Sequence, residues 1–182
     1  MLTEIRRKKL EKLFKVFDAN NNGSLDMNDI SIIAKKFTKE FGWSEDGNTN
    51  KNFKSSFLKV WTAMFREADF NNDKQVTTEE FLKYYGDVSA NDVLYFQCIK
   101  PFFDALFSSI DTNNDGLLSK EQYKAFYRAW GNSDEDAEEA FQKLDANKDG
   151  SISHLELYTM FYYFFMSDRD NDKSQIFFGK LN

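Results

Sequence analysis

The chain has 182 residues, a formal net charge of −6 and a pI near 4.9, and 30% of its residues are charged. This acidic balance excludes nucleic acid as an expected partner, because phosphates are bound by basic surfaces. The single cysteine, Cys98, excludes an internal disulfide framework, and 20 Phe, 8 Tyr and 3 Trp predict a large, well-filled interior.

The N-terminal segment has no apolar stretch of the kind that a signal peptide needs, and residue 2 is not the Gly that N-myristoylation requires. No apolar run approaches the ~20 residues that span a bilayer. We therefore expect a cytoplasmic protein with no stable membrane anchor. Leu10, Leu13, Phe14 and Phe17 mark the apolar stripe of a first helix. We interpret the basic residues 6–9 as its solvated face rather than as a membrane contact.

A polar segment of 12 residues follows that helix, at 18–29, and we number its positions 1 to 12. Position 6 is Gly23 and position 8 is Leu25. A hard cation such as Ca²⁺ takes about six to eight oxygen ligands, and a loop that wraps around it needs glycine at the sharp turn. The candidate ligands of this loop 1 are Asp18, Asn20, Asn22, Asp26 and Asp29, with the carbonyl of Ser24. The aspartate at position 12 is one methylene shorter than glutamate, which favours a six-coordinate site that also suits Mg²⁺.

The pattern then predicts a helix from Ile30 to about Phe41, a loop over 42–52, and a long helix from Phe53 to Phe65. Loop 2, residues 69–80, repeats the pattern of loop 1. Its candidate ligands are Asp69, Asn71, Asp73, Thr77 and Glu80, with the carbonyl of Gln75. Lys74 replaces glycine at position 6, where left-handed backbone costs a non-glycine residue about 1 kcal/mol. All the ligand positions survive, so we expect loop 2 to bind an ion.

Residues 86–92 are the expected boundary between two halves, 1–88 and 89–182. Pro101 is predicted in the first turn of a helix, where its missing N–H costs little, and Cys98 is interpreted as a buried thiol. Loop 3, residues 111–122, ends in Gln122. Its candidate ligands are Asp111, Asn113 and Asp115, with the carbonyl of Leu117. A neutral amide offers one oxygen and no charge, so we expect loop 3 to be the weakest site, or empty.

Gly131 is predicted to end the following helix and Ser133 to begin another. Loop 4, residues 145–156, then matches the pattern at every informative position. Its candidate ligands are Asp145, Asn147, Asp149 and Glu156, with Ser151 at position 7. The last predicted helix runs from Leu155 to about Phe165. A short apolar terminus follows, which we expect to dock into the body, and it contains Ile176, Phe177, Phe178 and Leu181.

Position 8 is apolar in all four loops, and there two loops can pair through a short β ladder. The residues at this position are Leu25, Val76, Leu118 and Ile152. We therefore predict an all-α fold with four helix–loop–helix units in two pairs, packed as one compact globule with short β bridges between paired loops.

The four loops resemble those of EF-hand proteins, and the whole chain is similar to the invertebrate sarcoplasmic calcium-binding proteins and their neuronal relative calexcitin. The likeness rests on the long insert between loops 1 and 2, the aromatic interior and the ending at residues 164–166 and 177–181. Asp29 and Lys74 look calexcitin-like, whereas Gln122 departs from any binding pattern. The resemblance implies a Ca²⁺/Mg²⁺ buffer with two or three working sites, and we expect three, in loops 1, 2 and 4.

Two alternatives share this fold. A calexcitin-like sensor would expose a hydrophobic surface to a protein target when calcium binds, but 5 Met against 20 Phe favour a closed buffer. Coelenterazine-binding photoproteins and luciferin-binding proteins need a cavity with His and Tyr partners, and the single His154 is expected to face outward. No Ser/His/Asp or Cys/His set suggests an enzyme. We expect a monomer whose partners are calcium and magnesium ions.

Overall fold

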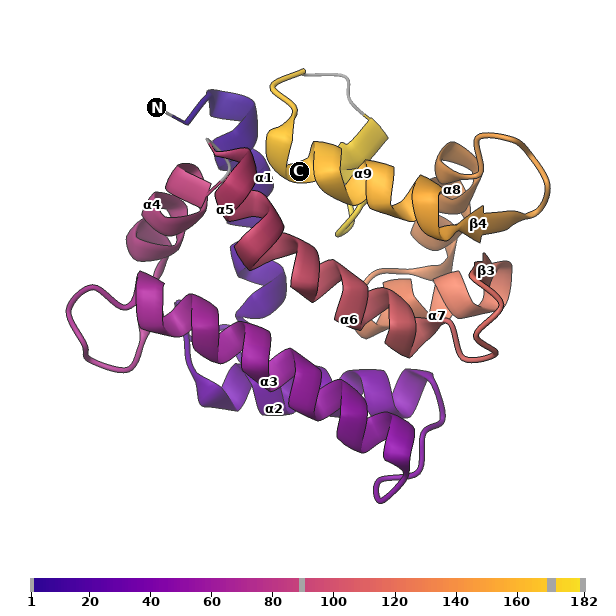
Figure 1. Ribbon diagram of the computed structural model, residues 1–182, viewed down its shortest axis with the longest axis horizontal. Coiled ribbons are helices and arrows are strands. Elements are labelled where there is room, and N and C mark those ends of the chain that lie inside the picture. Colours follow the sequence, from indigo (N-terminus) through magenta and orange to yellow (C-terminus); the bar gives the residue numbers. More distant parts are fainter. Residues whose placement is uncertain (1, 89–90, 170–172, 181–182) are drawn as a thin grey trace.

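The computed structural model describes residues 2–88, 91–169 and 173–180, which form a helical molecule with two short sheets (Figure 1). The first half contains α1 (Glu4–Phe17), β1 (Ser24–Leu25), α2 (Met27–Glu40), α3 (Asn48–Ala68), β2 (Val76–Thr77) and α4 (Thr78–Val88). The second half contains α5 (Asp92–Leu94), the π-helical turn η1 (Tyr95–Ile99), α6 (Lys100–Ile110), β3 (Leu117–Ser119), α7 (Lys120–Ala129), α8 (Asp134–Leu144), β4 (Ser151–Ser153), α9 (His154–Met166) and the 3₁₀ turn η2 (Lys173–Ile176). Within these ranges, no helix is both long and apolar enough to cross a membrane.

The sequence pattern of a loop also fixes the start of the helix that follows it. Position 9 is the N-cap of α2, α7 and α9, where Asp26, Ser119 and Ser153 accept hydrogen bonds from backbone N–H groups. Position 12 of the same loops is the third residue of the helix, and its side chain accepts from the backbone N–H of position 9. Each pair is a capping box, so one pattern sets both the oxygens of the loop and the beginning of the helix.

The four loops pair as predicted, through two antiparallel sheets. Strand β1 pairs with β2, with Leu25 opposite Val76, and β3 pairs with β4, with Leu118 opposite Ile152. All four of these position-8 side chains are fully buried. The ladder between loops 3 and 4 is one residue pair longer than the ladder between loops 1 and 2. Loop pairing therefore places loop 1 beside loop 2, and loop 3 beside loop 4.

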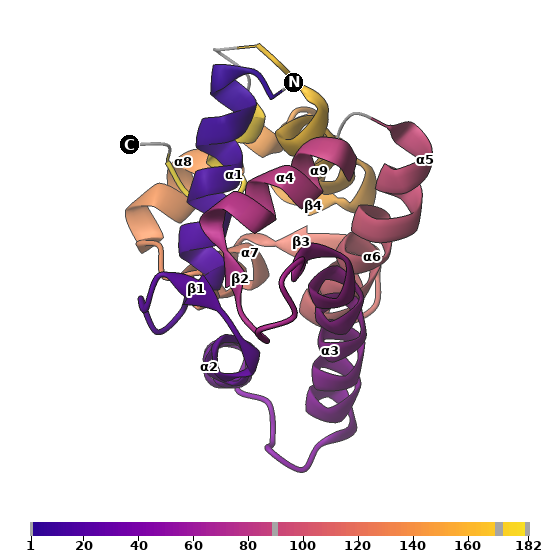
Figure 2. The same cartoon turned by 90° about the vertical axis from the view of Figure 1, so that its left-hand side faces the viewer.

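Helices of the two halves pack against each other around one aromatic core. Helix α2 contacts α7, α3 runs beside α6, and α1 contacts α9 (Figures 1 and 2). The ring of Phe17 lies 5.2 Å from Trp61, 6.0 Å from Phe102, 5.9 Å from Trp130 and 6.4 Å from Phe178. These rings come from both halves, so the predicted compact globule is confirmed. The division of the chain at 88/89 stays a prediction.

The C-terminal segment docks into the body, as predicted for its described residues. Phe177 and Phe178 are buried, and the ring of Phe178 lies 5.0 Å from Phe164. Tyr127 donates a hydrogen bond from its hydroxyl to the carbonyl of Ile176. Lys180 pairs with Asp136 at 2.7 Å and with Glu139 at 2.8 Å on α8. Leu181, which we assigned to the same apolar segment, lies outside the described residues.

The basic residues of α1 do not form a wholly solvated face, and that prediction was wrong for two of them. Lys9 is fully buried and donates to the carbonyls of Tyr163 at 3.1 Å and Ser167 at 3.0 Å. Arg6 donates to the carbonyl of Met166 at 2.8 Å and pairs with Asp168 at 2.8 Å. The last carbonyls of a helix lack intrahelical partners and lie at the negative end of its dipole, so they attract cations.

The predicted loop over 42–52 is too long, because α3 begins at Asn48. Asn50 explains the early start. Its side chain is fully buried, donates to the carbonyls of Ser44 and Glu45 at 3.3 and 3.1 Å, and accepts from Thr38 at 3.0 Å. These contacts reach back to α2 and hold the polar segment in a helical turn that its composition does not favour.

Pro101 lies in the first turn of α6 as predicted, but the helical segment begins earlier. Turn η1 and α5 continue it back to Asp92. A proline removes an N–H and crowds the carbonyl four residues before it, and the wider π turn is found at that place. Cys98, on this turn, is partly exposed in a groove with Met64 and Tyr84, so the prediction of a buried thiol was wrong.

Candidate metal centres

All four loops make the same backbone turn, which brings the N–H groups of positions 5 and 6 towards position 1. Positions 4 and 6 have positive φ in every loop. At position 6, φ is 86° for Gly23, 67° for Lys74, 81° for Gly116 and 85° for Gly150. Lys74 is the one non-glycine residue among these four, and the same conformation is strained for its side chain.

The aspartate at position 1 is held in place by that turn. In loop 4, Asp145 Oδ1 accepts from Asp149 N at 3.1 Å and Asp145 Oδ2 accepts from Gly150 N at 3.0 Å. The corresponding two bonds occur at Asp18, Asp69 and Asp111. In each loop, therefore, two backbone N–H groups orient the first carboxylate.

In loop 4, Glu156 links the end of the loop to its beginning. Its Oε2 accepts from Ser153 N at 2.8 Å, and its Oε1 accepts from Ala146 N at 3.1 Å. Burial alone would raise the pKa of Glu156, but the hydrogen bonds from Ser153 and Ala146 lower it overall. Asp149 accepts from Ser151 Oγ at 2.7 Å, and its pKa is lowered chiefly by that bond. Both side chains are therefore favoured as carboxylates, the form that binds a cation.

In loop 1, the shorter Asp29 makes the same link. Its Oδ2 accepts from Asp26 N at 2.9 Å and its Oδ1 from Asn20 N at 3.2 Å. The side chain is fully buried, and burial raises the pKa of Asp29 against the opposite effect of these two bonds. The short side chain of Asp29 thus holds its carboxylate in a buried position, close to the backbone of the loop.

In loop 2, Glu80 accepts at Oε2 from both Thr77 N and Thr77 Oγ1, each at 2.9 Å. Lys74 donates its backbone N–H to Asp69 Oδ2 at 3.0 Å, as the glycines of the other loops do for their position-1 residue. Lys74 therefore adopts the same turn geometry as the glycines, including the positive φ. Its backbone makes the bond that the loop needs, and strain is the cost.

Loop 3 closes through an amide instead of a carboxylate. Gln122 Oε1 accepts from Ser119 N at 2.8 Å, and Gln122 Nε2 donates to Thr112 Oγ1 at 3.0 Å. Thr112 was not among the predicted site residues. A sequence signal exists, because position 2 carries a hydroxyl only in this loop.

The expected ligand atoms at the candidate positions of the four loops are oxygens of carboxylates, amides, hydroxyls and carbonyls. Loops 1, 2 and 4 each place three carboxylates at these positions, and loop 3 places two. In the described part of the chain, no three acidic, His or Cys side chains converge closely enough to hold a metal ion by themselves. Amide oxygens and the position-7 carbonyl would have to complete each site, as calcium loops require. The full ligand set therefore stays a prediction.

His154 lies at position 10 of loop 4 and faces outward, as predicted. It is exposed, and its ring packs edge-on against Phe107 at 4.7 Å. Its backbone N–H donates to the carbonyl of Gly116 in loop 3 at 3.2 Å. The imidazole therefore belongs to the loop surface and not to the interior.

Comparison with known proteins gives a consistent result. The family model for an EF-hand domain pair matches residues 7–86 and 100–162. The sarcoplasmic calcium-binding protein of Scylla paramamosain is 31% identical over 175 residues, which cover 91% of this chain and 90% of that protein. Calerythrin of Saccharopolyspora erythraea is 28% identical over 166 residues, covering 87% of this chain and 91% of that protein.

Solved structures share the fold over nearly the whole chain. A sarcoplasmic calcium-binding protein from amphioxus has a TM-score of 0.77 at 19% identity and covers 99% of both chains. The calcium-loaded apo form of the coelenterazine-binding protein from Renilla muelleri has a TM-score of 0.77 at 23% identity, covering 99% of this chain and all of that one. At these identities the likeness concerns the arrangement of the helices.

Proposed function

This chain belongs to the EF-hand family and, within it, to the sarcoplasmic calcium-binding proteins, and on that basis we propose that it buffers calcium and magnesium ions with loops 1, 2 and 4. The relatives that match most of the chain include a sarcoplasmic calcium-binding protein and calerythrin. The three loops combine three carboxylates each with an intact turn and a position-12 carboxylate. Loop 3 lacks that last carboxylate.

Loop 1 is proposed as the site that also takes magnesium. Magnesium demands near-octahedral geometry with short distances, whereas calcium accepts a larger, irregular shell. Asp29 reaches the loop on a short arm and is fully buried. Such a position supports a small, six-coordinate site. In loops 2 and 4, the longer side chains of Glu80 and Glu156 can supply two oxygens each, which favours a seven-coordinate calcium ion.

The observation that carries the buffer function is the closed interior. Phe178, from the C-terminal segment, fills the centre between Trp130 at 5.6 Å and Phe164 at 5.0 Å. If the helix–loop–helix units opened, they would have to expel the ring of Phe178 and separate helices that share one core. A sensor needs a groove that opens at low cost, with adaptable side chains. The tightly packed aromatic centre supports a molecule that changes little on binding.

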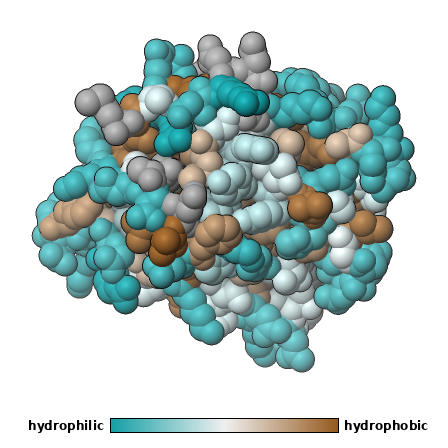
Figure 3. All heavy atoms as spheres, turned by 45° about the horizontal axis from the view of Figure 1, so that its top comes forward, coloured by the Kyte–Doolittle hydropathy of each residue, from teal (hydrophilic) through white to brown (hydrophobic). Residues whose placement is uncertain are grey.

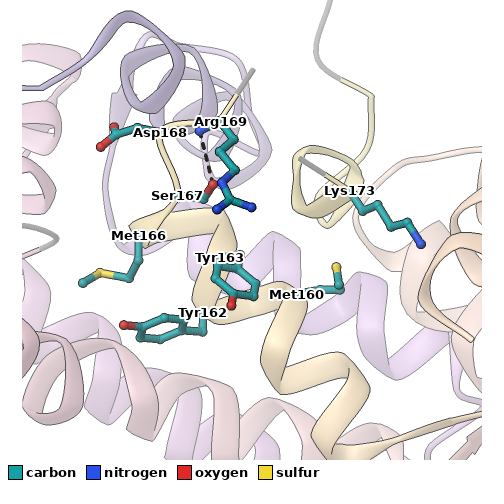
Figure 4. A pocket seen from close by; sticks show the side chains of 8 residues that line it. All are labelled: Met160, Tyr162, Tyr163, Met166, Ser167, Asp168, Arg169 and Lys173. Atoms are coloured by element: carbon teal, nitrogen blue, oxygen red, sulfur yellow. Dashed lines mark hydrogen bonds between the residues drawn. The ribbon is translucent and has the colours of Figure 1, made fainter. Parts of the chain in front are cut away.

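One surface feature favours the sensor alternative. A groove of about 690 Å³ lies at the end of α9 (Figure 4). Its lining is half apolar or aromatic and half polar, and it consists of Met160, Tyr162, Tyr163, Met166, Ser167, Asp168, Arg169 and Lys173. Its two methionines are the kind of side chain that adapts to a target. On the face shown in Figure 3, however, apolar residues form small patches separated by polar ones. We therefore rank this alternative below the buffer.

The coelenterazine alternative has less support. A ligand of that size would need the central space that Phe17, Phe102 and Phe178 occupy. His154, the single histidine, is exposed on loop 4. We also propose a cytoplasmic monomer, on the strength of the single cysteine and of the burial of most of the large aromatic side chains.

The proposed function is tested with a hydrophobic dye. The magnesium-loaded protein is mixed with the dye, and fluorescence is recorded before and after saturating calcium is added. A buffer with a closed interior should give little change, while calorimetry on the same sample should count three calcium ions. A large rise in fluorescence would show that a groove opens, and the sensor function would replace the buffer.

A further inference from the structure

Loop 3 differs from the other loops at two positions, and the structure connects them. Gln122 stands at position 12, and Thr112 places a hydroxyl at position 2. Gln122 Nε2 donates to Thr112 Oγ1 at 3.0 Å and lies 3.5 Å from Asn113 Oδ1. The two departures from the pattern are therefore the two ends of one contact.

The orientation of the Gln122 amide follows from its neighbours. Ser119 N donates to one head atom at 2.8 Å, and because a backbone N–H only donates, that atom has to be the carbonyl oxygen. The other head atom is then the NH₂ group, which has no lone pair for a cation. In loops 1 and 4 the corresponding atom is a carboxylate oxygen, which accepts from Asn20 N or Ala146 N. In loop 3 this atom of the position-12 side chain is therefore a hydrogen-bond donor, whereas in loops 1 and 4 it is an acceptor.

We propose that Gln122 closes loop 3 in place of an ion, so that this loop excludes calcium and serves as a fixed support for loop 4. The NH₂ hydrogens point at the oxygens of Thr112 and Asn113, where a bound cation would need lone pairs. A calcium ion would have to break this contact and would gain no charge at position 12. The inference rests on the proposed calcium binding at loop 4.

The support reaches loop 4 through the β3–β4 ladder. Gln122 and Ser119 are bonded in both directions, since Ser119 N donates to Gln122 Oε1 and Gln122 N donates to Ser119 Oγ at 3.2 Å. Ser119 is paired in the ladder with Ser151, which holds position 7 of loop 4. His154 N, donating to Gly116 O, adds a further link between the two loops. The closed loop 3 therefore holds a strand against a ligand position of loop 4.

The test follows three glycine amides by NMR while calcium is added to the full, ¹⁵N-labelled protein. Gly23, Gly116 and Gly150 occupy position 6, and each donates to the position-1 carboxylate of its loop, at 2.9, 2.9 and 3.0 Å. An ion on that carboxylate changes the bond and moves the resonance. We expect large displacements of Gly23 and Gly150 and only a small one of Gly116, whose carbonyl is bonded to His154 N of loop 4. A displacement of Gly116 as large as that of Gly150 would overturn this inference alone, whereas three unmoved resonances would overturn the proposed function as well.

Three variants separate exclusion from support. Gln122→Glu should make Gly116 respond to calcium, because it restores a carboxylate. Gln122→Met keeps the length of the side chain and removes all the hydrogen bonds of its amide group. It should raise the calcium concentration at the midpoint of the Gly150 response about three- to tenfold. Thr112→Val removes only the hydroxyl and should have a smaller effect in the same direction.

Gln142→Met is the matched control, because Gln142 is exposed on α8. It should leave the Gly150 midpoint at the wild-type value. If Gln122→Met and Thr112→Val also leave that midpoint unchanged, loop 3 does not support loop 4 and the inference fails on that point. An unresponsive Gln122→Glu variant would show that some other feature keeps calcium out.

Discussion

Lys9 donates a hydrogen bond from its ammonium to the main-chain oxygen of Ser167 at 3.0 Å, which ties the first helix to the end of α9. The same nitrogen reaches the carbonyl of Tyr163 at 3.1 Å and the hydroxyl of Ser174 at 3.3 Å. A cation thus caps the C-terminus of α9, where helix carbonyls have no partners of their own. Lys9 thus adds to the contacts of Arg6 in joining α1 to the end of α9, which is far away in the sequence.

Lys9→Met should lower the free energy of unfolding by about 1–3 kcal/mol, because it leaves buried carbonyls without a donor. Urea unfolding monitored by tryptophan fluorescence measures the change. Lys15→Met is the control, since Lys15 lies on the same helix and is exposed. Equal stability changes in the two variants would mean that the buried contact contributes nothing.

Lys74→Gly should raise the stability of the protein by about 1 kcal/mol, because glycine adopts a positive φ without steric cost. Lys74 has a φ of 67°. Lys74→Ala removes the same charge and keeps the strain, so it should not give this gain. If both variants stabilise the protein equally, the charge of the lysine and not its backbone is responsible. Chemical unfolding in the absence of calcium measures both.

Glu156→Gln should weaken calcium binding at loop 4 about a hundredfold, because the charge of the ligands spreads EF-hand affinities over several decades. The amide can still accept from Ser153 N, so the helix cap survives. Calorimetry should then count one calcium ion fewer at moderate concentrations. An unchanged stoichiometry would remove Glu156 from the ligand set.

Asp29→Glu should shift loop 1 from magnesium towards calcium, with the ratio of the two affinities changing about tenfold. The longer side chain can offer both oxygens, which calcium accepts and magnesium does not. The amide resonance of Gly23 reports the exchange when magnesium is added to the calcium-loaded protein. Glu156→Asp is the reciprocal variant and should move loop 4 in the opposite direction. A ratio that stays constant in both would contradict the proposed role of side-chain length.

The four loops were predictable because each is a pattern of residues that are close in sequence. Positions 9 and 12 of loop 4 also form the capping box of the next helix, over only four residues. Gln122 was recognisable as a departure for the same reason. The hydrogen bonds that Gln122 makes were not predictable, because the sequence does not show how its amide group is oriented.

The predictions that failed concern contacts between distant segments. Nothing near Lys9 in the sequence indicates that the end of α9 will cover it. Asn50 lies in a polar stretch that reads as a loop, and its contact with Thr38 on α2 makes the segment helical. Cys98 is partly exposed on the π turn η1, a turn that the sequence pattern did not predict. For Lys9 and Asn50, a tertiary contact overrode a local preference.

The position of Phe178 has a consequence for synthesis on the ribosome. Its ring contacts Phe17 and Phe164 at the centre of the core, although it lies near the end of the described chain. The ribosome delivers the helix–loop–helix units in order. The first unit therefore cannot complete its apolar packing until the segment that carries Phe178 has been synthesised. The nascent protein therefore completes its interior late, and during that interval its exposed aromatic rings are open to chaperones and to aggregation.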